Sequence, residues 1–192
     1  MSVTGMRFKS RVAAAEEAKP DTPLRPLEET ETYDLPAFKT HRMDLNGLPT
    51  STTASGAQLQ EYFESMYRMR RMETKADELY MTGHVRGFCH LYNGQEAVAV
   101  GVEAAVSYED YLITAYRNHC QQLARGDTVE AVLSELTGRA TGCSGGKGGS
   151  MHLYKPENRY FGGNGIVGAQ GPLGTGLAFA AKYQGTKNVA IS

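Results

Sequence analysis

The longest regular pattern of apolar and polar residues runs from about residue 57 to residue 80, where apolar side chains return every three to four positions. This spacing is typical of an amphipathic helix. The residues that carry it are Leu59, Phe63, Met66, Met69 and Met72. A second helix is predicted over Gln95–Val106, where the sequence is nearly all apolar or small.

Further along the chain, short strand and helix patterns alternate. Tyr111–Ala115 has the composition of a short strand, and a helix is predicted from Asp127 to about Gly138. Another helix is expected to have Pro172 in its first turn and to stop at Gly185, and Asn188–Ser192 is predicted to be a buried strand. Alternating helices and strands favour a three-layer α/β domain with a mainly parallel sheet.

The first 50 residues lack these patterns. They contain five prolines and an acidic cluster at 28–31, a composition that cannot bury enough apolar surface to fold alone. We therefore predict a flexible arm over residues 1–50 and a domain over residues 51–192. No acidic residue precedes Glu16, while three basic residues do, which fits an organellar transit peptide as well as an ordinary unstructured terminus.

Composition and charge exclude several classes of protein. With 41% hydrophobic residues, 21% charged residues and a net charge of −1, the chain has no bulk attraction to nucleic acid or an anionic membrane. No apolar run approaches the roughly 20 residues needed to cross a bilayer. The three cysteines form no CxxC pair and the five histidines are scattered, so neither a disulfide scaffold nor a zinc site is predicted.

The chain contains 22 glycines, many of them between residues 138 and 185, where a phosphate-binding loop would be sought. Glycine follows Lys147, so the hydroxyl residue of a P-loop is missing. Gly163–Gly168 matches GxGxxG by its letters, but we expect no strand before it, and no acidic residue follows Glu157 to bind a ribose. Because no aspartate or glutamate follows Glu157, this glycine-rich part of the chain offers no carboxylate to a magnesium ion, and no metal ligand is predicted.

Four blocks in order along the chain resemble the pyruvate dehydrogenase alpha subunit family. They are Arg86–Ala97 (RGFCHLYNGQEA), Ile113–His119 (ITAYRNH), Lys147–His152 (KGGSMH) and Gly162–Gln170 (GGNGIVGAQ). Such an ordered set is more specific than any single glycine motif. The likeness extends from about Phe38 to Ser192 and implies the three-layer, Rossmann-like fold that binds thiamine diphosphate.

The resemblance also implies roles for particular residues. Tyr116 and Arg117 match a pair that contacts the diphosphate of the cofactor, and an arginine fork suits a phosphate group. His90 matches a histidine beside the diphosphate and the pyruvate site, and is the catalytic candidate. The backbones of Gly165 and Val167 match positions that contact the aminopyrimidine ring. The matched substrate-binding positions are His90, Tyr116, Arg117, Lys155, Gly165 and Val167.

The reaction implied by the resemblance is the oxidative decarboxylation of pyruvate, with the acetyl group passed to a lipoyl acyltransferase component and finally to coenzyme A. Its expected partner is a beta subunit, in an alpha2beta2 heterotetramer. The matching Gly-Asp-Gly and Asn ligands of Mg²⁺ are expected beyond Ser192, so the fold is predicted to be incomplete at its carboxyl end and the chain alone inactive. The residues of the four blocks are most similar to those of mitochondrial forms, which favours the mitochondrial matrix over a plastid or a bacterial cytoplasm.

Two alternatives remain open from the residues. The chain could be a short, non-catalytic partner of the beta subunit, because the helices are present and the metal ligands are not. It could instead act on a branched-chain or acetoin-type substrate, although the sequence Phe88-Cys89-His90 favours pyruvate.

Overall fold

The structure is a computed structural model that describes residues 28–42 and 46–192. The residues that suggested a transit peptide lie outside this part of the chain. The described residues divide into two compact units, which meet at Gly56 and are described separately. No helix among them is long and apolar enough to cross a membrane.

The first unit contains a two-stranded antiparallel ribbon within and beside the segment that we predicted to be an arm. Strand β1 (Thr30–Asp34) pairs with β2 (Ser51–Ser55), with Thr30 opposite Ser55 and Asp34 opposite Ser51. Both strands are rich in threonine, whose β-branched side chain favours extended backbone. The prolines and acidic residues around them concealed this local preference, so β1 was not predicted.

The second unit contains five α-helices, one 3-10 turn and three strands among its described residues. They are α1 (Gly56–Met81), α2 (Glu96–Ala105), β3 (Tyr111–Ala115), α3 (His119–Ala124), α4 (Val129–Leu136), η1 (Pro156–Asn158), β4 (Tyr160–Asn164), α5 (Gln170–Tyr183) and β5 (Ala190–Ile191).

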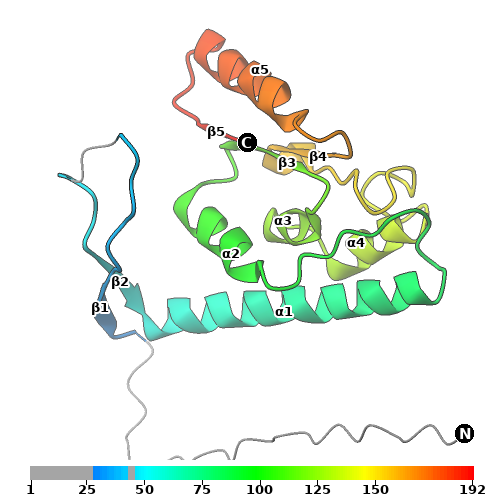
Figure 1. Ribbon diagram of the computed structural model, residues 1–192, viewed down its shortest axis with the longest axis horizontal. Helices are drawn as coiled ribbons and strands as arrows, with labels where there is room; N and C mark the ends of the chain where they lie inside the picture. Colours follow the sequence, from blue (N-terminus) through cyan, green and yellow to red (C-terminus); the bar gives the residue numbers. More distant parts are fainter. Residues whose placement is uncertain (1–27, 43–45) are drawn as a thin grey trace, which may run out of the picture. The chain divides into compact units, whose positions relative to one another are not determined.

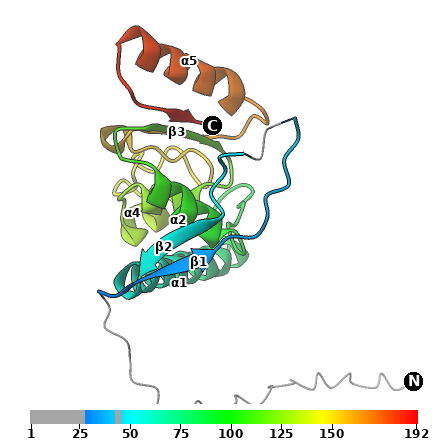
Figure 2. The same cartoon turned by 90° about the vertical axis from the view of Figure 1, so that its left-hand side faces the viewer.

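The three strands form a parallel sheet in the order β4-β3-β5, with β3 in the centre. Helix α5 covers one face of this sheet, while α2, α3 and α4 lie on the other face with α1 beneath them (Figures 1 and 2). The unit is therefore a three-layer α/β arrangement, which confirms the predicted fold class. The main core lies between α1 and the helices above it, and is built around Met69, Met72, Ala99, Cys120 and Val132.

Several elements differ from those predicted. The last strand is only two residues long and half-buried, not a buried strand over Asn188–Ser192. Helix α4 begins at Val129, because the side chain of Thr128 accepts a hydrogen bond from the Ala131 amide and caps it. Helix α3 was not predicted. Strand β4 was not predicted either, and it leads into Gly163–Gly168, so the expectation that no strand precedes this motif was wrong.

An ion pair joins α1 to the start of α2. Arg70 donates through Nε and Nη2 to the two carboxylate oxygens of Glu96, and the Gly94 amide donates to the same carboxylate at 3.0 Å. The hydrogen bond from Arg70 is the largest cause that lowers the pKa of Glu96, to about 2, against the opposing effect of its burial.

This ion pair predicts a dependence of stability on acid. Because the folded pKa of Glu96 lies below the unfolded value of about 4.3, its contribution is fully present above pH 5 and is lost as pH falls towards 2. We expect the free energy of unfolding to decrease over this interval, and less steeply in Glu96→Gln. Urea titrations at a series of pH values would measure this pH dependence of the free energy of unfolding. The control is Glu78→Gln, at an exposed position on α1, and an identical slope in both variants would contradict the assignment.

Candidate functional site

The carboxyl ends of β3 and β4 lie side by side and define the candidate site. Ala115 pairs with Asn164 in parallel register, so the residues that follow these two positions leave the sheet at the same edge. The chain then turns from β3 towards α3 on one face and from β4 towards α5 on the other (Figure 1). Neighbouring strands whose connections diverge in this way form a crevice, and α/β proteins bind their ligands there.

Tyr116 and Arg117 are the first residues after β3, and buried polar contacts hold the segment that carries them. Asn118 donates to the Met151 carbonyl and to the Tyr160 hydroxyl. The next residue, His119, bridges the Glu73 carboxylate on α1, at 2.9 Å, and the Ser150 carbonyl, at 2.8 Å. These side chains are fully buried, so the backbone on the carboxyl side of Arg117 is fixed to both the helical layer and the sheet.

His90 reaches this edge from the loop between α1 and α2. Its ring lies 4.2 Å from the ring of Tyr116 and 4.5 Å from that of Phe88, measured between centroids. Within the described part of the chain, the buried Nδ1 atom of His90 has no hydrogen-bond partner. Burial, followed by the charges of Arg117 and His119, lowers the pKa of His90, so its imidazole is neutral at physiological pH.

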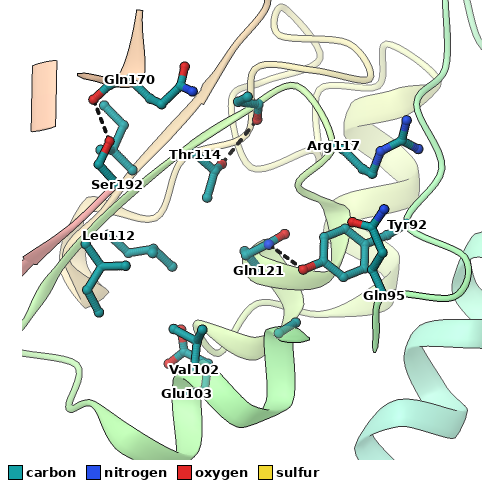
Figure 3. A pocket seen from close by; sticks show the side chains of 14 residues that line it. Tyr92, Gln95, Val102, Glu103, Leu112, Thr114, Arg117, Gln121, Gln170 and Ser192 are labelled. Carbon is teal, nitrogen blue, oxygen red and sulfur yellow. Dashed lines mark hydrogen bonds between the residues drawn. The ribbon is translucent and has the colours of Figure 1, made fainter. Parts of the chain in front are cut away.

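Arg117 lines a cavity of about 260 Å³ between β3, β5, α2 and the start of α5. In Figure 3, Arg117 lies on one side of this cavity with Tyr92 and Gln121, while Gln170 and Ser192 lie on the other. The Nη1 atom of Arg117 donates to the Leu91 carbonyl, which ties the guanidinium to the loop that carries His90. The side-chain oxygens of Gln121 and Gln170 are buried without a partner among the described residues, so the cavity also offers acceptors to a ligand or water.

Gly165 and Val167 follow β4 in the loop that leads to α5. Val167 is 81% exposed, so its side chain points away from the folded core. A Cβ atom added to Gly165 would lie 3.5 Å from Nε2 of His152, whose Nδ1 is 3.2 Å from the Gly163 carbonyl. His152 therefore lies against the backbone of this loop, a placement that its scattered position in the sequence did not indicate.

Lys155 lies at the other end of β4. It forms an antiparallel bridge with Tyr160, the first residue of the strand, and its ammonium group pairs with Glu157 at 2.9 Å. Four residues of extended strand, about 13 Å, separate Tyr160 from the edge at which the other candidates gather. The structure does not bring Lys155 together with His90 and Arg117.

The glycine-rich loop around Lys147 does not offer its amides to a phosphate. Glu135, fully buried on α4, accepts hydrogen bonds from the amides of Ser144, Gly146 and Gly148, at 2.8, 2.9 and 2.6 Å. The carboxylate takes the position that an anion would occupy in a P-loop, on the inner side of the loop. Ser150, just after the loop, donates to the Phe88 carbonyl at 2.7 Å and so supports the segment that carries His90.

The sequence model of the dehydrogenase E1 component family matches residues 64–192, about two thirds of the chain. The chain belongs to this family. It is 56% identical over 142 residues to the mitochondrial pyruvate dehydrogenase E1 component subunit alpha-1 of Arabidopsis thaliana, which covers 74% of this chain and 36% of that protein. It is 46% identical over 187 residues to the somatic form of the alpha subunit of Rattus norvegicus, covering 95% of this chain and 47% of the relative.

A third relative, the testis-specific mitochondrial alpha subunit of Homo sapiens, is 48% identical over 159 residues, which cover 81% of this chain and 40% of the relative. The E1 chain described here thus spans less than half the length of each of these three proteins. Dehydrogenase E1 components depend on thiamine diphosphate. Within residues 28–42 and 46–192 there is no group of three histidine, cysteine, aspartate or glutamate side chains that could hold a metal ion.

Proposed function

We propose that this E1 family member provides the alpha-subunit side of a thiamine diphosphate site for the oxidative decarboxylation of pyruvate. The observation that carries the proposal is the convergence of His90, Tyr116 and Arg117 at the carboxyl edge of β3, beside the Gly165 loop of β4. Three matched blocks, distant in the sequence, meet there.

The residues present fit the diphosphate end of this cofactor. Arg117 contributes a permanent positive charge at the cavity, and His90 has a buried ring nitrogen without a partner among the described residues. Gly165 has no side chain, so its backbone is open to close approach by a planar ring. We assign the diphosphate to Tyr116 and Arg117, the aminopyrimidine to the backbones of Gly165 and Val167, and pyruvate to the vicinity of His90.

When bound, thiamine diphosphate supplies the electron sink for loss of carbon dioxide. The residues of this chain bind and orient it. Burial lowers the pKa of His90, and a neutral imidazole can donate a hydrogen bond through one ring nitrogen and accept one through the other. The rings of Phe88 and Tyr116 both pack against the His90 ring and restrict its orientation.

The remaining parts of the proposal follow the relatives. We place residues 51–192 in the first part of the cofactor-binding domain, and we propose a beta subunit as partner in an alpha2beta2 heterotetramer, with the lipoyl acyltransferase component as acceptor. E1 alpha subunits generally pair with a beta subunit. We propose Mg²⁺ as counter-ion of the diphosphate, held by ligands outside residues 1–192. We also propose the mitochondrial matrix as the compartment, because the matched relatives are named as mitochondrial proteins.

A hybrid E1 tests this function. In it, the present sequence replaces the matched segment of the Arabidopsis thaliana alpha-1 subunit, co-expressed with its beta subunit. We expect thiamine diphosphate-dependent release of carbon dioxide from pyruvate, with a higher kcat/KM than for branched-chain 2-oxoacids or acetoin. A correctly assembled hybrid without turnover would favour a non-catalytic role for this chain, and a preference for another substrate would reassign the specificity.

A further inference from the structure

A second cavity, on another part of the second unit, has several basic side chains in its lining. It measures about 550 Å³ and lies between the turn that follows α1, the end of α4 and the glycine-rich loop. Its charged or titratable lining residues are His84, Arg86, Arg139 and Lys147. None of its lining residues also lines the cavity beside Arg117, and none belongs to the candidate cofactor site.

The three permanent cations of this basic cavity come from three separate segments. Arg86, Arg139 and Lys147 are all exposed, and none of them has a side-chain hydrogen bond or an ion pair within residues 28–42 and 46–192. Among the residues that the structure describes, no carboxylate side chain lines the cavity. A hollow lined by one sign of charge concentrates its field and raises the local concentration of counter-ions.

The chain segments that carry two of these cations are held against each other. A Cβ atom added to Gly146 would lie 2.5 Å from the carbonyl carbon of Gly138 and 2.7 Å from the Arg139 carbonyl oxygen. Gly146 also has a φ of +74°, which disfavours a side chain. The backbones that precede Lys147 and Arg139 are therefore in direct contact, so these two cations are presented together.

Among the described residues, the three cations neither pair with a neighbouring carboxylate nor cap a helix end. Glu135 lies beneath the loop, but its two oxygens already accept three amide hydrogen bonds. The carboxyl end of α4 is capped by amides, including that of Gly138, which donates to the Glu135 carbonyl. Glu130 lines an adjoining hollow with His84 and Arg139 but bonds to neither.

We propose that the basic cavity binds a phosphate-bearing anion. Two guanidinium groups and one ammonium group match a phosphate, which accepts bidentate hydrogen bonds from arginine and is attracted to lysine as a point charge. The cavity is larger than a single phosphate ion needs, so a small phosphomonoester also fits it. The chemistry shared by free phosphate and a phosphomonoester is the dianionic phosphoryl group, and both serve as probes.

Isothermal titration calorimetry of the full 192-residue chain, at constant ionic strength, tests the proposal with inorganic phosphate, phenyl phosphate and succinate. We expect the two phosphates to bind and succinate to bind at least about tenfold more weakly. Tighter binding of phenyl phosphate than of inorganic phosphate would identify a phosphomonoester as the ligand, and the reverse would identify the free ion.

Variants assign the binding to this cavity. Arg139→Gln and Lys147→Gln are each expected to weaken phosphate binding about tenfold or more, whereas Arg68→Gln, at an exposed cation on α1 outside the cavity, leaves it unchanged. Arg117→Gln alters the proposed cofactor site and leaves the lining of the basic cavity intact, so it separates phosphate bound beside Arg117 from phosphate bound in the basic cavity. Equal binding of succinate, or loss of binding only in Arg117→Gln, would overturn the proposal. Unchanged circular dichroism and unfolding midpoints would show that the variants are folded.

Discussion

Replacing Arg117 by glutamine in the hybrid E1 is expected to weaken thiamine diphosphate binding about 10- to 100-fold, since a charge-assisted hydrogen bond contributes about 1.5 to 3 kcal/mol. Arg117 adjoins the cavity and is tied to the loop of His90 through the Leu91 carbonyl. The change therefore removes a charge and also loosens the link between two parts of the site. The dependence of pyruvate decarboxylation on cofactor concentration measures the effect.

Two further variants separate charge from geometry in this prediction. Arg117→Lys keeps the positive charge but loses the planar fork, so its affinity is expected to lie between those of the native protein and Arg117→Gln. Arg159→Gln is a matched control, because Arg159 is a half-exposed arginine that precedes the other end of β4 and pairs with Glu109. If Arg117→Gln bound the cofactor as tightly as Arg159→Gln does, Arg117 would have no part in holding the diphosphate.

Replacing Glu135 by alanine is expected to destabilise the chain by about 3 to 5 kcal/mol. The change leaves the amides of Ser144, Gly146 and Gly148 without their acceptor, and each unpaired buried donor costs about 1 to 3 kcal/mol. Relaxation of the loop towards water recovers part of this cost. Urea unfolding at neutral pH measures the difference.

The loop also supports the site, so Glu135→Ala has a second readout. Ser150 anchors the Phe88 carbonyl after the loop, and rearrangement there is expected to lower the cofactor affinity of the hybrid E1. Glu130→Ala is the control, because Glu130 is an exposed acid in the first turn of the same helix and its loss costs at most about 1 kcal/mol. A similar stability loss in both variants would show that the glycine-rich loop does not depend on the buried carboxylate.

Local sequence patterns predicted the elements that carry strong periodic signals. The spacing of Leu59, Phe63 and Met66 indicated α1 almost to its observed ends, and Tyr111–Ala115 was predicted with its observed bounds. Strand β4 gave no such signal because two of its five residues are glycine, which is depleted in strands. It is a strand because its backbone pairs with β3, an interaction that depends on residues about 50 positions away.

Helix α3 was missed for a related reason. Its six residues are too few for a helical repeat to stand out, and three of them, His119, Cys120 and Gln122, are buried. Two of these buried side chains are polar, so the helix does not follow the usual pattern of an apolar inner face. Its stability comes from specific partners such as Glu73 and the Tyr154 carbonyl, which no local rule identifies.

The sequence by itself determined the fold class, the family and the identity of the site candidates, because periodicity and ordered blocks are properties of the linear chain. The tertiary structure decided which candidates meet. His90 and Tyr116, separated by 25 intervening residues, are in ring contact, while Lys155 lies at the far end of β4. It also decided that the amides of the glycine-rich loop face Glu135. Strand register and side-chain direction set these contacts, and both depend on packing between segments that are distant in the sequence.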